Sequence, residues 1–327
     1  MSATLVFFGV VQTLLYLLFI RFIDLYEREP LRYVIPVFVW GFTVAVILSL
    51  LFNAIFAFTL TSVVGARAAD LLTVVVGAPI IEECSKGLAL LIVFGISYAV
   101  ARGRGAVEFS GVMDGIVYGS AVGFGFSIAE DVFYYAQYGP ETFVVRRIFG
   151  GFAHAAFTAL IGIGIGLIPW VRNPFLKVAL PLLGLVGAIL LHAVFNLAAT
   201  LAGPLAYGIL FLIVLSYIVL IVAWLAVERR AIRDELREEV AAGVVSPEEY
   251  EILPTYFRRT GRYLKLLFSG RISEWFRERK AHHAAVDLAL TKRASRGRWT
   301  GSQDRRISFL RGKTLSLKTP TNAREVR

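Results

Sequence analysis

The sequence predicts an all-α fold, a polytopic membrane helix bundle of about seven transmembrane helices with a cytoplasmic basic tail that is first helical and then disordered. The 327 residues are 57% hydrophobic and only 18% charged, whereas a soluble domain is nearer half apolar and a quarter charged. The mean hydropathy is +0.68. Runs of about 20 apolar residues are long enough to cross a bilayer as helices. Seven such runs lie at 4–23, 33–60, 71–100, 112–136, 146–169, 175–201 and 205–227.

Charge divides the chain into a neutral body and a basic tail. Residues 1–227 hold 11 basic and 11 acidic residues, and the remaining 23 basic and 13 acidic residues carry the whole formal charge of +10. We expect a transmembrane domain over 1–227, a cytoplasmic helical extension over 228–290 and a basic, disordered tail over 291–327. The tail is expected to lie against anionic lipid headgroups. It lacks a dense stripe of aromatic and basic residues, which argues against nucleic acid as a partner.

The Lys and Arg bias of the loops predicts the orientation. With seven helices and the tail inside, the inner loops carry seven basic residues and the outer loops three. Cytoplasmic loops are enriched in Lys and Arg. We therefore expect a multi-pass protein of the cell membrane with its N-terminus outside and its tail in the cytoplasm.

The third and fourth predicted helices carry features beyond apolar length. Pro79 cannot donate to the carbonyl of Val75 and should kink the third helix one turn before two glutamates. The fourth helix has a stripe of small residues at i+4 spacing, which lets another helix backbone approach closely. The stripe consists of Gly111, Gly115, Gly119 and Gly123.

Polar side chains inside four of the apolar runs are the least expected feature of the sequence. A charged group at the centre of a bilayer costs about 2.5–3.5 kcal/mol, so these groups must neutralise one another, bind a metal or line a wet cavity. Counting 1.5 Å per residue along each helix brings most of them to the outer half of the bilayer. They are Glu82, Glu83 and Lys86; Asp114, Glu130 and Asp131; His154; and His192 and Asn196.

Spacing separates the members of one expected site from its neighbours. Glu82 and Lys86 are four residues apart and share a helix face, whereas Glu83 points about 100° away. Asp131 should face away from Glu130, and Asp114 should cap or snorkel at the inner end of its helix. His282 and His283 lie in the polar tail, where we expect them to be solvated.

Two histidines with carboxylates suit zinc, which in catalytic sites takes three protein ligands and a water. A further carboxylate could then act as general base. Alternatively, a buried glutamate activates water without a metal, helped by histidine, and Asn196 donates to the oxyanion. Neither H-E-x-x-H nor G-x-S-x-G is present. Cys84 is a poor candidate nucleophile because two carboxylates precede it.

Four short motifs together resemble the PrsW family of intramembrane peptidases, which is related to the CAAX prenyl endopeptidase and ABI superfamily. E-E-x-x-K lies at 82–86, F-x-x-x-E at 126–130 and H-x-x-x-N at 192–196, and His154 follows Arg147 by seven residues. The segment D-x-Y-E-R-E-P at 24–30 is similar to the first loop of the family. The resemblance implies a membrane protease with a membrane-protein substrate. It further implies a first, outer-side cut in a membrane-bound anti-sigma factor.

From these residues we expect the following roles. Glu82 activates the water, with Glu83 as the other candidate, Asn196 assists the oxyanion and Lys86 balances the carboxylate charge. Zinc, or the water itself, is held by Glu83, Glu130, His154 and His192.

Two other functions use the same residues. A proton- or ion-coupled transporter could employ the carboxylates as a relay, although no inverted repeat is visible and only the third helix is clearly broken. A non-catalytic scaffold could bind other membrane helices through the site.

Overall fold

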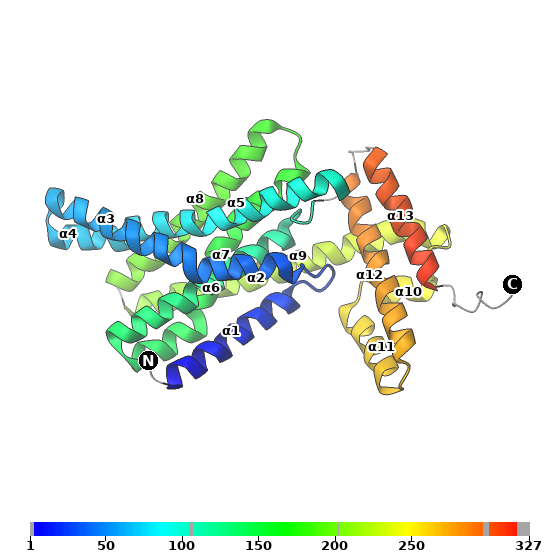
Figure 1. Cartoon of the computed structure of the whole chain (residues 1–327), viewed down its shortest axis with the longest axis horizontal. Coiled ribbons are helices and arrows are strands. Elements are labelled where there is room, and N and C mark those ends of the chain that lie inside the picture. Colours follow the sequence, from blue (N-terminus) through cyan, green and yellow to red (C-terminus); the bar gives the residue numbers. More distant parts are fainter. Residues whose placement is uncertain (1–2, 105–106, 202, 297–300, 319–327) are drawn as a thin grey trace. The chain divides into compact units, whose positions relative to one another are not determined.

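The computed structural model describes residues 3–104, 107–201, 203–296 and 301–318, and every regular element in them is a helix. This confirms the all-α membrane bundle (Figure 1). The chain forms two compact units. Unit 1 comprises residues 1–24, 29–103 and 107–222, and unit 2 comprises residues 25–28, 104–106 and 223–327.

Unit 1 contains the apolar helices. Six helical stretches of the described chain are long and apolar enough to cross a membrane, and α1 adds a shorter apolar stretch, Gly9–Ile23. Each long stretch overlaps one of the predicted spans, and two of them are each assembled from three helical segments. The elements are α1 (Ala3–Ile23), α2 (Leu31–Trp40), η1 (Gly41–Ala45), α3 (Val46–Val64), α4 (Ala66–Leu72), η2 (Thr73–Gly77), α5 (Ala78–Arg104), α6 (Val112–Tyr138), α7 (Pro140–Gly166), η3 (Ile168–Trp170), α8 (Pro174–Leu201) and α9 (Pro204–Ala241).

Two spans contain a π-helical turn. One of them, η2, ends directly before Ala78 and Pro79, at the place where the sequence predicts a disturbed helix. The other, η1, was not predicted. It begins at Gly41, where a Cβ atom would lie 2.1 Å from the carbonyl oxygen of Val122 in α6. The π-helical turn η1 therefore lies where the backbone of α6 comes very close, and nothing in the sequence around Gly41 indicates this approach.

The glycine stripe of α6 packs against α7, as expected. A Cβ atom on Gly119 would lie 2.6 Å from the Cα atom of Ala159, and one on Gly123 would lie 2.4 Å from the carbonyl oxygen of His154. Real Cβ atoms do not approach backbone so closely, so only glycine fits at these points. Because of this packing, α6 is almost wholly buried and holds the backbone of His154 directly beside it.

Unit 2 is a small helical domain with its own apolar core. It is built from the end of α9 together with α10 (Pro247–Ile252), α11 (Tyr256–Phe268), α12 (Ile272–Ser295) and α13 (Gly301–Lys318). Ile232, Leu236 and Val286 are fully buried in the core. Ser246 caps α10, with Glu249 completing a capping box.

Two expectations about this part of the chain are wrong. Residues 301–318, expected to be disordered, form α13, whose Ile307 and Leu310 are buried in the core and whose Arg311 binds Glu239. His282, expected to be solvated, is only 3% exposed and is hydrogen-bonded to the hydroxyl of Tyr263 at 2.9 Å. The basic composition of this segment does not indicate that acidic residues on other helices pair with it. Residues 297–300 and 319–327 lie outside the described part of the chain.

Candidate metal and catalytic site

The α5 segment that follows the π-helical turn presents two glutamates and a lysine to the interior. Lys86 Nζ lies 2.8 Å from Glu83 Oε1 and 3.4 Å from Glu82 Oε2. The side chains of Lys86 and Glu83 have no exposed surface, and that of Glu82 is 11% exposed. The predicted pairing of Glu82 with Lys86 is present, and Glu83 joins it because the flexible lysine side chain reaches both carboxylates.

His154, on α7, connects this trio to α6. Its Nδ1 lies 3.1 Å from Lys86 Nζ, and its Nε2 lies 2.8 Å from Glu130 Oε2. An ammonium group can only donate. Nδ1 of a neutral His154 therefore accepts from Lys86, which leaves the Nε2 proton to be donated to Glu130 in this arrangement.

His192 enters the cluster from α8. Its Nδ1 lies 3.0 Å from Glu83 Oε1, and its Nε2 lies 4.0 Å from Glu82 Oε2. The ring stacks on Phe157 with centroids 4.8 Å apart. A carboxylate that accepts the Nδ1 proton fixes the tautomer and leaves the Nε2 lone pair available, which is the usual arrangement behind a metal-ligating histidine.

Three of these residues can hold a metal ion together. In the described part of the chain, Glu82, His154 and His192 each offer one ligand atom, all within 4.8 Å of one another, and all three residues are buried. Two imidazoles and a carboxylate are a zinc-type donor set. With neutral histidines and ionised carboxyl groups, the trio of Glu82, Glu83 and Lys86 has a net charge of −1, which favours a bound cation. The residues therefore fit a metal if Nδ1 of His154 exchanges its contact with Lys86 for the ion while its Nε2 proton stays on Glu130.

The group that could hold a metal differs from the expected ligand set in its carboxylates. Glu83, expected as a ligand, has Oε1 bonded to Lys86 and His192 and Oε2 accepting from Thr158 at 3.2 Å. Glu130, also expected as a ligand, contacts Nε2 of His154 and is not in the group of described residues that could hold an ion. Glu82, expected as the base, is the carboxylate grouped with both histidines.

Asn196 and Asp131 lie apart from this group. The amide of Asn196 donates to the carbonyl oxygen of Val74, inside the π-helical turn, at 2.9 Å. Asp131 faces away from Glu130, as expected, and accepts from Gln12 of α1 at 3.1 Å.

Sequence reasoning missed two neighbours of the cluster. The hydroxyl of Thr158, one turn after His154, holds Glu83, and Lys86 Nζ lies 3.9 Å from the centre of the Phe126 ring. The spacing of four residues between His154 and Thr158 was the available signal.

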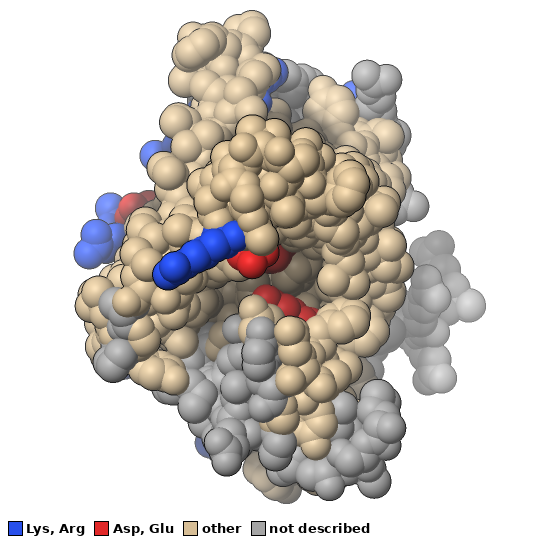
Figure 2. Space-filling model, turned by 90° about the vertical axis from the view of Figure 1, so that its left-hand side faces the viewer, with Lys and Arg blue, Asp and Glu red and all other residues tan. Residues whose placement is uncertain are grey.

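The cluster is not sealed from solvent. The side chain of Glu130 is 21% exposed. Seen from the end where α3 meets α4, the molecule has a hollow in which acidic side chains are visible (Figure 2). Carboxylates inside a hollow of a membrane bundle are accessible to water, which a hydrolytic reaction requires.

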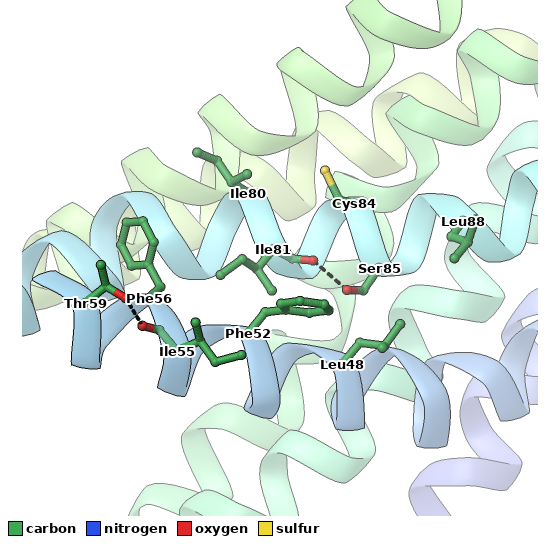
Figure 3. A pocket seen from close by; sticks show the side chains of 10 residues that line it. All are labelled: Leu48, Phe52, Ile55, Phe56, Thr59, Ile80, Ile81, Cys84, Ser85 and Leu88. Carbon is green, nitrogen blue, oxygen red and sulfur yellow. Dashed lines mark hydrogen bonds between the residues drawn. The ribbon is translucent and has the colours of Figure 1, made fainter.

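The opposite face of α5 is apolar. It lines a pocket of about 550 Å³ with α3, and Figure 3 shows Phe52 and Ile81 between the two helices. Cys84 and Ser85 also line this pocket, whereas Glu82, Glu83 and Lys86 do not. The helix thus separates the polar site from an apolar surface, and Cys84 belongs to the latter.

Bundle and site together define a multi-pass membrane protein with a buried His–Glu site that fits a metal. Residues 29–225 match the profile of the family described as PrsW family intramembrane metalloprotease. The match covers more than half of the chain, which therefore belongs to this family.

A curated relative supports this assignment. The chain is 29% identical over 143 residues to "Protease PrsW" of Geobacillus kaustophilus (strain HTA426). The similar region covers 44% of this chain and 57% of that protein, so the chain spans little more than half the length of the relative. No solved structure matches the chain.

Proposed function

We propose that this protein is an intramembrane endopeptidase that hydrolyses a peptide bond in or near a membrane-spanning segment of another protein. The observation that carries the proposal is the buried group of Glu82, His154 and His192 inside a bundle of apolar helices. Membership of the PrsW family supports the same reaction.

The three grouped residues are the proposed zinc ligands. A bound zinc would polarise the scissile carbonyl and activate a water molecule. Glu83 orients His192 through Nδ1, and Lys86 offsets the charge of Glu83 at 2.8 Å. Both act on the ligands through hydrogen bonds from outside the ligand set.

Glu130 is the proposed proton acceptor. It is the most exposed carboxylate of the cluster, and Oε2 lies 2.8 Å from His154 Nε2. A proton taken from the attacking water by Glu130 can be returned to the leaving amine, with His154 holding the carboxylate in place. If the site works without a metal, Glu82 takes the part of the base.

The remaining features of the proposal concern the surroundings of the site. We propose an outer N-terminus and a cytoplasmic C-terminal region, because the basic residues gather in the loops and tail on that side. The substrate is a membrane-anchored protein of the anti-sigma-factor type, cut on its outer side. The basic C-terminal region faces anionic lipids.

Elemental analysis tests the metal. The full-length protein, purified in detergent without chelator, should contain close to one zinc per chain, and His192→Ala should contain far less. Cys84→Ala is the matched control, because Cys84 lies on the same helix but lines the apolar pocket on its other face. Equal zinc in all three proteins would refute this ligand set.

A cleavage assay tests the reaction. The protein is co-expressed with a tagged single-pass membrane protein of the anti-sigma-factor type, and fragments are followed by immunoblotting. We expect cleavage by the wild type and by Cys84→Ala, and none by Glu82→Gln. Cleavage that persists in a Glu82→Gln, Glu83→Gln double variant would rule out the proposed site. A pH-dependent ion flux through proteoliposomes without any cleavage would favour the transporter.

A further inference from the structure

Helix α11 in unit 2 is amphipathic, yet its apolar side faces away from the protein. Phe257 and Phe268 are each 84% exposed, and Leu264 between them is 46% exposed. At about 100° per residue these three positions fall within one narrow stripe. Arg259 and Leu266, on the other side of the helix, are each only 6% exposed. A solvent-facing helix normally has the reverse polarity.

Specific polar contacts fix this orientation of α11. Arg259 donates to the backbone carbonyls of Leu253 and Leu25. Arg262 forms a two-pronged ion pair with Glu278 of α12, with nitrogen–oxygen distances of 2.6 and 2.9 Å. Turning the aromatic stripe inward would break these bonds. The polar contacts of α11 therefore hold its apolar stripe on the outside of unit 2.

Helix α12, which packs against α11, also exposes large apolar side chains. The two helices form a hairpin through Gly270, which has a φ of +72°. Beyond it, Ile272 is 44% and Phe276 is 53% exposed. We call Phe257, Leu264, Phe268, Ile272 and Phe276 the α11–α12 apolar surface. Such a cluster of large exposed side chains marks a binding surface.

The charges around this surface indicate what kind of partner binds it. Residues 256–280 contain eight Lys or Arg and two Glu, Glu274 and Glu278. Both acids are paired with arginines, Arg271 and Arg262 respectively. Arg258 and Lys265 are exposed at the border of the stripe. Aromatic and aliphatic side chains flanked by basic ones are typical of helices that lie in the interface of an anionic bilayer.

We propose that the α11–α12 apolar surface inserts into the headgroup layer of an anionic membrane, with Phe257 and Phe268 as its anchors. The protein is embedded in a bilayer already, so this partner is always present at high effective concentration. The inference does not depend on the proposed peptidase reaction, but it deepens the proposed contact of the C-terminal region with anionic lipids. It assigns membrane contact to particular apolar side chains instead of the overall charge of the tail.

Site-directed spin labelling of the full-length protein tests the insertion. Phe257→Cys and Phe268→Cys are labelled in a Cys84→Ala background, which removes the free cysteine. Glu251→Cys is the matched control, since Glu251 is exposed on neighbouring α10 and is not part of the surface. Each protein is reconstituted into vesicles of phosphatidylcholine alone or with added phosphatidylglycerol. Collision with oxygen, which concentrates in the bilayer, is compared with collision with a water-soluble nickel chelate.

In vesicles with phosphatidylglycerol, we expect labels at 257 and 268 to become severalfold less accessible to nickel and more accessible to oxygen, while the label at 251 remains accessible to nickel. Arg258→Gln with Lys265→Gln should reduce the difference between the two lipids. Labels at 257 and 268 that stay accessible to nickel in both lipids would overturn the proposal. Labels shielded from both reagents, whatever the lipid, would overturn it in favour of a protein partner such as a second copy of the chain.

Discussion

Glu83 in unit 1 and Glu239 in unit 2 both have fully buried side chains, but their surroundings differ in charge. Glu239 binds two cations, Lys292 Nζ at 2.8 Å and the guanidinium of Arg311 at 2.7 and 2.8 Å. Among the described residues, Glu83 pairs with one lysine, Lys86, which it shares with Glu82, and it also contacts His192 and Thr158.

The difference distinguishes a glutamate with a purely structural role, Glu239, from one in a functional site, Glu83. A buried carboxylate that serves only the fold needs full compensation, and Glu239 has it. Among the described residues, the trio of Glu82, Glu83 and Lys86 holds two carboxylates against one ammonium, and two histidines lie beside it. Uncompensated charge costs stability, so its presence is best explained by a cation or a reacting group that the cluster binds.

The largest expected effect comes from Glu83→Gln. The amide can still accept the Nδ1 proton of His192, but it supplies less negative charge and no longer pairs with Lys86. Removing a carboxylate that orients a metal-ligating histidine lowers metal affinity by about 10–100-fold. Zinc retention should therefore fall at lower chelator concentrations, measured by titration with a coloured chelator.

Thr158→Val is the graded control for that experiment. It removes one hydrogen bond to Glu83 Oε2, at 3.2 Å, and keeps the charge. We expect a smaller loss of affinity than for Glu83→Gln. If Glu83→Gln binds zinc as tightly as the wild type, then Glu83 is a structural acid like Glu239, and the comparison fails.

Glu239→Gln tests the other side of the comparison. The substitution removes the carboxylate that pairs with Arg311 and one of the two that pair with Lys292, which keeps Glu238 at 2.9 Å. We expect unit 2 to lose about 2 kcal/mol of stability. Arg311 is 41% exposed and regains water, which keeps the effect below that of a fully buried pair. Hydrogen exchange of α12 and α13 amides should speed up while the zinc content stays unchanged. A loss of zinc would show that this acid also serves the site.

Much of the site could be predicted from the sequence because intramembrane charges are rare and expensive. Glu82, Lys86, His154 and His192 were selected by cost and depth alone, and the structure brings them together. Which of Glu82 and Glu83 lies beside both histidines could not be predicted. Adjacent residues on a helix differ by 100°, and the choice depends on how α5 is rotated against α7 and α8.

The error about α13 has a different cause. Residues 301–318 look disordered by composition, because their charges are read without their partners. In the structure Arg311 meets Glu239, 72 residues earlier in the chain. Lys318 binds Glu249. Composition indicates how much apolar surface a segment can bury, but it does not include the ion pairs that the segment forms with distant helices.

Mild acidification should destabilise unit 2 through protonation of a buried histidine, before the carboxylates of its ion pairs are protonated. Burial lowers the pKa of His282 from 6.5 to about 4. In the unfolded chain the imidazole of His282 is protonated below about pH 6.5, whereas in the folded chain it is protonated only below about pH 4. The free energy of unfolding therefore falls as the pH falls through this interval. At pH 5.5 the loss from this histidine is about 1 kcal/mol relative to pH 7.5.

Hydrogen exchange of α11 and α12 at the two pH values, corrected for intrinsic rates, measures this effect. His282→Gln removes the titrating group, so its pH dependence should be smaller than that of the wild type even if the variant is less stable overall. An unchanged pH dependence would mean that the neutral, Tyr263-bound form of His282 is not what holds these helices together.

The smallest effect is expected for Asn196→Ala, and it decides whether Asn196 belongs with the reacting groups or with the scaffold. An oxyanion donor typically contributes a factor of about 10²–10³ to kcat. In the structure the amide is bonded to the carbonyl of Val74 in the π-helical turn that precedes Glu82. We therefore expect a loss of less than about tenfold in cleavage, corresponding to one hydrogen bond of about 1 kcal/mol. Asn196→Asp, which cannot donate to that carbonyl, should resemble Asn196→Ala. A thousandfold loss of kcat with KM and zinc content unchanged would instead move Asn196 to the oxyanion, and the amide would have to turn away from Val74 during the reaction.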